Sequence, residues 1–141
     1  MYLIDKEKNR IQTLSKKSFT ELGFKERQHL QEWIANKPDA LGEELLIIQK
    51  EFDGFSETNE RLDLLALDKD SNIVVIENKL DDTGRDVTWQ VLKYASYCST
   101  LTKENIKDIY QNYLDKQGTG EDARANLADF LGKEYDEIEL N

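Results

Sequence analysis

The densest hydrophobic segment of the chain is RLDLLALDKDSNIVVIENKL, residues 61–80, in which two apolar runs flank a polar centre. Residues 68–72 are typical of a hairpin turn, so the two runs are expected to form adjacent strands. Apolar residues occupy both faces of the runs, as Leu64 and Leu65 illustrate, which indicates central strands covered on both sides. Charged side chains in such strands need a partner or a bound ion.

Three charged residues interrupt these runs: Asp63 in the first, and Glu77 and Lys79 at the end of the second. If Asp68 pairs with Asn72 across a three-residue loop, Asp63 falls opposite Glu77, with Cβ atoms about 5 Å apart. Lys79 follows Glu77 by two residues and shares its face. A register slip of one residue would move Asp63 to the other face, so this geometry depends on the loop length.

Two opposed carboxylates suit a hard cation such as Mg²⁺. A cation held there can polarise a phosphodiester and help to generate hydroxide from water. The lysine could orient the water or stabilise charge that develops on phosphate. The alternative is a structural domain in which Lys79 forms an ion pair with one of the acids. The hairpin by itself does not separate the two interpretations.

The remaining elements follow from apolar spacing, turn residues and capping residues. A helix that ends before Pro38 and a strand precede the central hairpin, and three helices follow it. Thr83 and Asp86 form a capping-box-like start for the first of these three helices. The expected elements are a hairpin over 1–14, a helix over 25–36, a strand over 45–52, a loop over 53–60, a helix up to about 101, an amphipathic helix that contains Ile106, Ile109, Tyr110, Tyr113 and Leu114, and a short helix around Leu127.

Gln90 and Tyr94 are four residues apart, so they share one face of their helix. With Asp63 and residues 77–79, they resemble the Asp, E-x-K and Q-x-x-x-Y motifs of the PD-(D/E)XK nuclease superfamily, in particular its NucS-like and RecB-like domains. The resemblance covers residues 20–101. It implies a metal-dependent DNA endonuclease in which Asp63 and Glu77 bind Mg²⁺ or Mn²⁺. It also implies that Lys79 assists the attacking water, and that Gln90 and Tyr94 complete the site.

Glu26 looks like the acid that this superfamily carries on its first core helix. It lies on the apolar stripe of Leu30 and Trp33. The alternative is an acid in the first turn that the helix dipole favours. Three further acids are rival candidates for the same role: Glu43, Glu44 and Glu51.

The order of helix, three strands and helix resembles the αβββα start of a restriction-endonuclease-like α/β fold, with a mixed central sheet flanked by helices. That core normally closes with another strand, and the only candidate after Leu101 is Tyr135 to Leu140. One hypothesis is that the chain is an N-terminal piece of a longer protein and lacks the closing strand. The expected organisation is a hairpin arm over 1–20, a nuclease-like core over 21–116 and an acidic tail over 117–141.

The 141 residues, of which 38% are hydrophobic, fit one domain with a modest core. No run approaches the roughly 18 apolar residues of a membrane helix. The N-terminus lacks the apolar core of a secretory signal. The single cysteine, Cys98, excludes an internal disulfide, fits a reducing cytoplasm and is expected to be a packed thiol. His29, the only histidine, is expected at the surface rather than on a metal.

The net charge of −10 argues against tight binding of bare duplex DNA. The charge is uneven, because residues 1–27 contain seven Lys or Arg and four acids, which leaves −13 for the remainder. A partner, either an additional C-terminal domain or another copy in a homo-oligomer, could supply the grip on DNA. The second class of function is therefore a non-cleaving nuclease-fold module that binds DNA or protein. The intact Asp63, Glu77 and Lys79 favour the nuclease.

Overall fold

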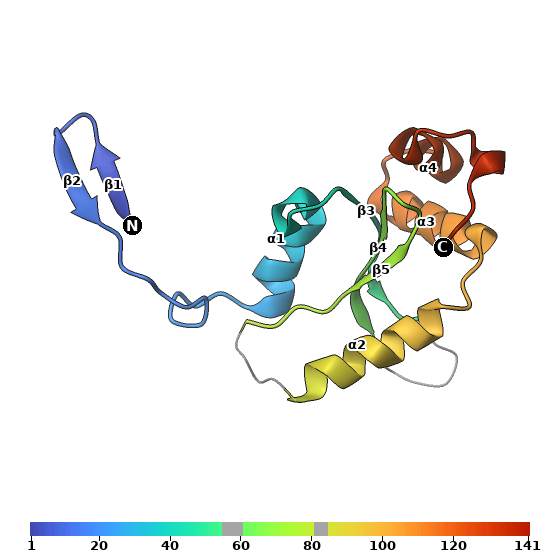
Figure 1. Ribbon diagram of the computed structural model, residues 1–141, viewed down its shortest axis with the longest axis horizontal. Coiled ribbons are helices and arrows are strands. Elements are labelled where there is room, and N and C mark those ends of the chain that lie inside the picture. The colour runs from blue at the N-terminus through green and yellow to red at the C-terminus, as the bar shows by residue number, and fades with distance from the viewer. Residues whose placement is uncertain (55–60, 81–84) are drawn as a thin grey trace.

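The computed structural model of the chain describes residues 1–54, 61–80 and 85–141. These residues form a mixed α/β structure with two small antiparallel sheets and four α-helices (Figure 1). None of the described helices is both long enough and apolar enough to cross a membrane.

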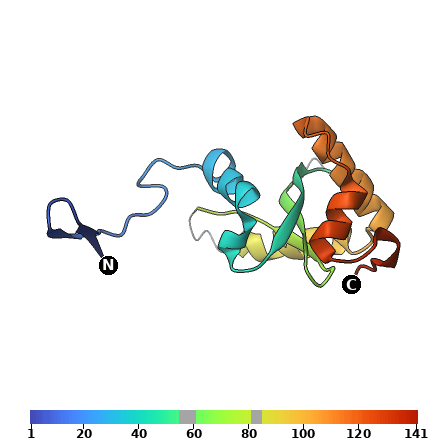
Figure 2. The same cartoon turned by 90° about the horizontal axis from the view of Figure 1, so that it is seen from above.

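The N-terminal sheet is a hairpin of β1 (Tyr2–Asp5) and β2 (Arg10–Thr13), which confirms the expected hairpin. Two views show it lying apart from the rest of the molecule, at the end of an extended segment (Figures 1 and 2). Contacts between aromatic rings anchor the base of this segment. Phe19 and Phe24 contact Trp33 edge-on, with ring centroids 5.8 and 4.9 Å apart.

The central sheet has the order β3-β4-β5, with β3 (Leu45–Phe52), β4 (Leu62–Asp68) and β5 (Ile73–Ile76). The predicted strand over 45–52 is confirmed. The register between β4 and β5 is also the expected one, because Leu64 pairs with Ile76 and Leu67 pairs with Ile73.

The loop length that fixes this register is confirmed at the turn. The Asp68 N–H donates to the Asn72 carbonyl at 3.1 Å, and the Asp68 side chain accepts the Asn72 N–H at 2.8 Å. Three residues therefore separate the closing pair of the hairpin.

Helices cover both faces of the central sheet, as the apolar pattern of the strands predicted. On one face, η1 (Glu26–Leu30), which is a π-helical turn, leads into α1 (Gln31–Asn36), so the predicted helix over 25–36 is present. The other face is covered by α2 (Arg85–Cys98), α3 (Lys103–Gln117) and α4 (Ala123–Leu131). A capping box of Thr102 and Asn105 begins α3, and Gly118, with φ of 68°, ends it.

Two clusters of buried side chains fix these layers. The larger cluster joins Leu65 and Leu67 of the sheet to α2, α3 and α4. The smaller cluster joins Leu64 and Ala66 to α1. Because neighbouring residues of β4 enter different clusters, the alternation of side chains along this strand holds the two helical layers together.

Both strand pairs of the central sheet are antiparallel among the residues that the structure describes, so the mixed sheet expected from the family resemblance stays a prediction. A parallel partner requires a crossover connection to a further strand. The candidate for that strand, Tyr135 to Leu140, instead begins with a short 3-10 helix, η3 (Tyr135–Glu137). Within 1–54, 61–80 and 85–141, the sheet therefore ends at β5.

Residues 117–141, expected as an acidic tail, contain α4 and η3 and contribute to the main core. The predicted helix around Leu127 is confirmed. Leu127, Tyr135 and Ile138 are buried in the same cluster as the inner face of α3. Their apolar side chains tie this segment to the body of the protein despite its acidic surface.

Candidate active site

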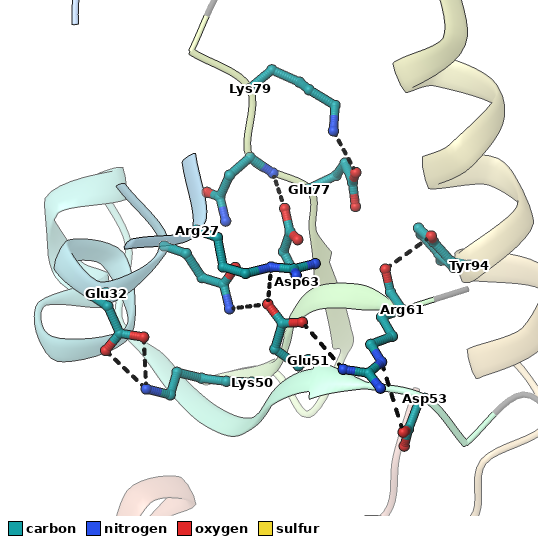
Figure 3. A network of polar contacts seen from close by, with 12 residues as sticks. Arg27, Glu32, Lys50, Glu51, Asp53, Arg61, Asp63, Glu77, Lys79 and Tyr94 are labelled. Carbon is teal, nitrogen blue, oxygen red and sulfur yellow. Dashed lines mark hydrogen bonds and ion pairs between the residues drawn. The ribbon is translucent and has the colours of Figure 1, made fainter. Parts of the chain in front are cut away.

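Three acids lie next to one another across the central sheet, at the end opposite the hairpin turn. They are Glu51 of β3, Asp63 of β4 and Glu77 just beyond β5, and together they are called the acid row. The ladder pairs on either side of Glu51 place it opposite Asp63. The β4–β5 register continues to Glu77 on the other side of Asp63. Figure 3 shows the three carboxylates close together.

The middle acid is held by the backbone of the segment that follows β5. Asp63 Oδ2 accepts a hydrogen bond from the Asn78 N–H at 2.8 Å. Because this N–H binds a side chain, β5 ends at Ile76 and the E-x-K residues lie beyond the ladder. Burial raises the pKa of Asp63, and the negative charge of Glu51 adds to this effect.

Glu77 is deeply enclosed, with a side chain only 5% exposed. Its Oε1 accepts a hydrogen bond from Lys79 Nζ at 2.8 Å. Its Oε2 is buried and has no hydrogen-bond partner among the described residues. Burial raises the pKa of Glu77, and the nearby Asp63 charge acts in the same direction. A buried carboxylate with one unsatisfied oxygen is unfavourable unless a further group binds it.

Lys79 remains protonated in this setting. Burial by itself would lower its pKa, but the hydrogen bond to Glu77 and the charges of Glu26 and Asp63 outweigh burial, so the pKa of Lys79 is raised. The expected placement of Lys79 on the same side as Glu77 is confirmed by their contact.

Of the four candidates for the upstream acid, the structure brings two to the site. Glu26 Oε1 accepts the Leu80 N–H at 3.0 Å, and its charge acts on Glu77 and Lys79. Glu51 belongs to the acid row. Glu43 and Glu44 precede β3 at the opposite end of the sheet, where Glu44 pairs with Lys69 at 3.4 Å.

Glu51 is surrounded by partners that the sequence analysis missed. Its Oε1 binds Gln31 Nε2 and Arg27 Nε, each at 2.9 Å. Arg61 approaches its Oε2 at 3.9 Å (Figure 3). Arg27 and Gln31 are four residues apart on the helix that carries Glu26, and this spacing is a signal that sequence reasoning could have used. The backbone of Glu51 has φ of 53°, an uncommon value for a residue other than glycine that no sequence pattern announced.

The two helix residues of the motif lie on the inner face of α2. Tyr94 is buried and its hydroxyl donates to the Arg61 carbonyl at 3.0 Å, so it ties α2 to the residue before β4. Gln90 lies one turn earlier and is half-buried. Thr83, expected near the start of this helix, is outside the described residues. The roles of Gln90 and Tyr94 in the site stay predictions.

Cys98 is buried two turns after Gln90, and burial raises the pKa of its thiol to about 11, so it is the packed and unreactive thiol that was expected. His29 is half-buried rather than at the surface, and its Nδ1 accepts the Lys25 N–H at 3.0 Å. Its ring packs against Phe24, with the centroids 5.3 Å apart. His29 thus contributes to the aromatic contacts at the base of the arm.

Among the described residues, no three His, Cys, Asp or Glu side chains form a ready-made metal cage. Mg²⁺ is commonly bound through one or two carboxylates and takes its other ligands from water and substrate phosphate. Asp63 and the unpartnered oxygen of Glu77 fit that requirement. Comparisons with protein-family models, curated proteins and solved structures found no match to this chain.

Proposed function

We propose that this chain is a metal-dependent DNA endonuclease with a restriction-endonuclease-like core, in which Asp63 and Glu77 hold Mg²⁺ or Mn²⁺. One observation carries the proposal: the buried Glu77 carboxylate keeps an unpartnered oxygen next to a second carboxylate. A divalent cation would satisfy that oxygen and relieve the repulsion between the two acids. The order of Asp, E-x-K and Q-x-x-x-Y along the sequence supports the same assignment.

A bound cation supplies Lewis acidity at the phosphodiester. The contribution of Lys79 follows from its raised pKa, because a lysine that stays protonated acts as a hydrogen-bond donor rather than as a general base. It can therefore orient the attacking water and stabilise the charge that develops on the phosphate.

Two other residues position the reacting groups. Glu26 binds the Leu80 N–H and so fixes the segment that carries Glu77 and Lys79. Tyr94 binds the carbonyl of Arg61, two residues before Asp63. Gln90, one turn from Tyr94, is assigned to substrate or water at the edge of the site.

Arg27 and Arg61 can contact DNA phosphates locally, although the net charge of the chain is negative. Both side chains are more than half exposed and lie beside the acid row. Arginine binds phosphate oxygens readily through its planar set of donors. The proposed substrate backbone therefore runs past these two residues, and the negative remainder of the surface keeps the affinity for duplex DNA modest.

A non-cleaving nuclease-fold module that binds DNA or protein is the second candidate, and two observations favour it. Lys79 already neutralises one oxygen of Glu77 at 2.8 Å, and the net charge is −10. In such a module the acid row would be a structural network, with no requirement for a divalent cation.

Titration calorimetry with Mn²⁺ and Mg²⁺ separates the two functions. We expect the wild-type chain to bind one cation, and Glu77→Gln to abolish that binding. Glu44→Gln is the matched control, because it removes an acid at the far end of the same sheet. Cleavage is then measured on single-stranded, branched and mismatched DNA. Cation binding that persists in Glu77→Gln, or cleavage that survives in both Asp63→Asn and Lys79→Ala, would eliminate the proposed site.

A further inference from the structure

The N-terminal arm, residues 1–17, has an apolar face that nothing in the described structure covers. Across the hairpin, Ile4 pairs with Ile11 and Tyr2 pairs with Thr13, so these side chains share one face of the ribbon. Tyr2, Ile4 and Ile11 are 68, 67 and 71% exposed. The arm extends away from the rest of the chain in both views (Figures 1 and 2).

A two-stranded ribbon is at best marginally stable in water unless it packs against another surface. The arm is nevertheless built as an ordered element, because four consecutive pairs form its ladder and edge-on aromatic contacts anchor its base. An ordered ribbon with one apolar face is typical of a segment that docks on a partner.

Charge indicates what the partner is. Residues 1–17 contain five Lys or Arg and two acids, a net charge of +3, whereas the remaining residues carry −13. The arm is therefore electrostatically complementary to the body of its own chain, and a second copy of the chain presents that same body. A DNA duplex would also attract the basic residues, but it offers no apolar surface for Tyr2, Ile4 and Ile11.

The surface area is sufficient for a dimer. The chain exposes 9886 Å² of accessible surface. A compact monomer of 16.4 kDa is expected to expose about 7,500 Å². The excess is larger than the roughly 800 Å² per partner that a standard interface buries.

The body carries a matching apolar strip on α2. Trp89 and Leu92 are 74 and 55% exposed and lie three residues apart, so they share one side of the helix. Asp86, one turn before Trp89, is exposed on the same side and offers a negative charge next to the strip. The strip therefore combines apolar surface with a negative charge, which is opposite in sign to the net charge of the arm.

We propose that the chain forms a symmetric dimer by arm exchange, in which the apolar face of the arm packs on the Trp89–Leu92 strip of a second copy. The same contact occurs twice in such a dimer, because each copy supplies one arm and one strip. The Lys and Arg residues of the arm then lie against the acidic body. This assembly does not depend on cation binding or cleavage, so its failure and that of the proposed nuclease are distinguishable.

Light scattering on the full chain over a range of concentrations tests the dimer. We expect a mass near twice 16.4 kDa at micromolar concentration. The changes Ile4→Glu and Trp89→Glu, one on each side of the contact, should each raise the dimer dissociation constant by more than about tenfold, because each buries a charge in the interface. Leu3→Glu is the matched control, since Leu3 lies on the other face of the same ribbon. The Leu3→Glu chain should dimerise as the wild type does.

Mixed cysteine variants test the pairing of surfaces. An Ile4→Cys chain mixed with a Trp89→Cys chain should form a disulfide-linked heterodimer, whereas Leu3→Cys with Trp89→Cys should not. Cys98 does not interfere, because its buried thiol is unreactive. The proposal is overturned if the wild-type chain remains monomeric over a 100-fold range of protein concentration. The proposal is also overturned if the Ile4→Glu chain loses affinity for DNA but keeps the dimer mass of the wild type. That result would make the arm a DNA contact.

Discussion

Asp63 and Glu77 face each other across the β4–β5 hairpin, and Asp63 also binds the backbone N–H of Asn78, the residue after Glu77, at 2.8 Å. This hydrogen bond pulls the E-x-K segment out of the ladder and towards the acid row. Burial raises the pKa of both acids. The protein therefore maintains two partly buried carboxylates at an energetic disadvantage, which is the arrangement expected where a ligand compensates for it.

Asp63→Asn should stabilise the metal-free protein. The pKa of Asp63 is raised, so the folded state binds its proton more tightly than the unfolded state does. At neutral pH the ionised carboxylate therefore lowers the free energy of unfolding, and stability increases as the pH falls towards the folded pKa. Asparagine keeps an acceptor for the Asn78 N–H and removes the charge. We expect thermal unfolding to shift upward by about 2 to 4 °C.

The control for this change is Asp129→Asn, which neutralises an exposed acid on α4. Its melting temperature should stay close to that of the wild type. A lower melting temperature for Asp63→Asn would mean that the ionised carboxylate contributes favourably to the folded state.

Affinity for Mn²⁺ should increase with pH in a range that lies above the ordinary pKa values of the two acids. The pKa values of Asp63 and Glu77 are raised above 3.8 and 4.5, and a protonated carboxyl is a poor ligand. Calorimetry from pH 5 to pH 8 should show the dissociation constant falling as the acids ionise and then becoming constant. An affinity independent of pH over this range would argue that neither acid is a ligand.

Lys79→Met should separate cation binding from catalysis. Lys79 competes with a cation for Glu77, so its removal should leave Mn²⁺ affinity unchanged or several-fold higher. Cleavage should fall by about 100-fold, because a donor to the developing charge is lost. The control is Lys69→Met, which removes a lysine from the turn at the far end of the hairpin. Loss of cation binding in Lys79→Met would instead assign the lysine a structural role.

Tyr94→Phe tests whether the motif tyrosine is a positioning residue. The change removes the hydrogen bond to the Arg61 carbonyl and should lower the free energy of unfolding by about 1 kcal/mol. If Tyr94 acts through the backbone, kcat should fall modestly and the substrate KM should stay constant. A large rise in KM with unchanged stability would show that the hydroxyl contacts DNA.

Arg27→Gln and Arg61→Gln should each weaken binding of single-stranded DNA and make the binding less dependent on salt. The salt slope decreases because each guanidinium that contacts a phosphate releases about one condensed counterion. Lys133→Gln, on the exposed surface beyond α4, serves as the control. Equal slopes for all three variants would place the DNA elsewhere on the chain.

Local sequence signals fixed the elements that form the site. The apolar runs on either side of the turn at 68–72, together with the loop length, predicted the strands, their register and the opposition of Asp63 to Glu77. Helical spacing gave the inward face of α2, including Tyr94 and Cys98. These features depend on contacts between residues that are close in the chain, and periodicity reports such contacts directly.

The other features of the site depended on contacts between residues that are far apart in the sequence. The sequence favoured Glu26 as the upstream acid and left three rivals. Only the antiparallel pairing of β3 with β4 brought Glu51 to Asp63 and left Glu44 at the far end. The partners of Glu51, the loss of β5 pairing after Ile76 and the packing of residues 123–138 into the core likewise follow from side chains meeting across elements.

The sequence by itself determined which residues are strands and helices, which faces are apolar and which charges interrupt the central hairpin. The tertiary structure decided which of those charges meet, how deeply each is buried and which oxygen of Glu77 lacks a partner. The physical reason is that periodicity and turn chemistry act within a few residues, whereas burial and electrostatic coupling depend on every element that packs around a group.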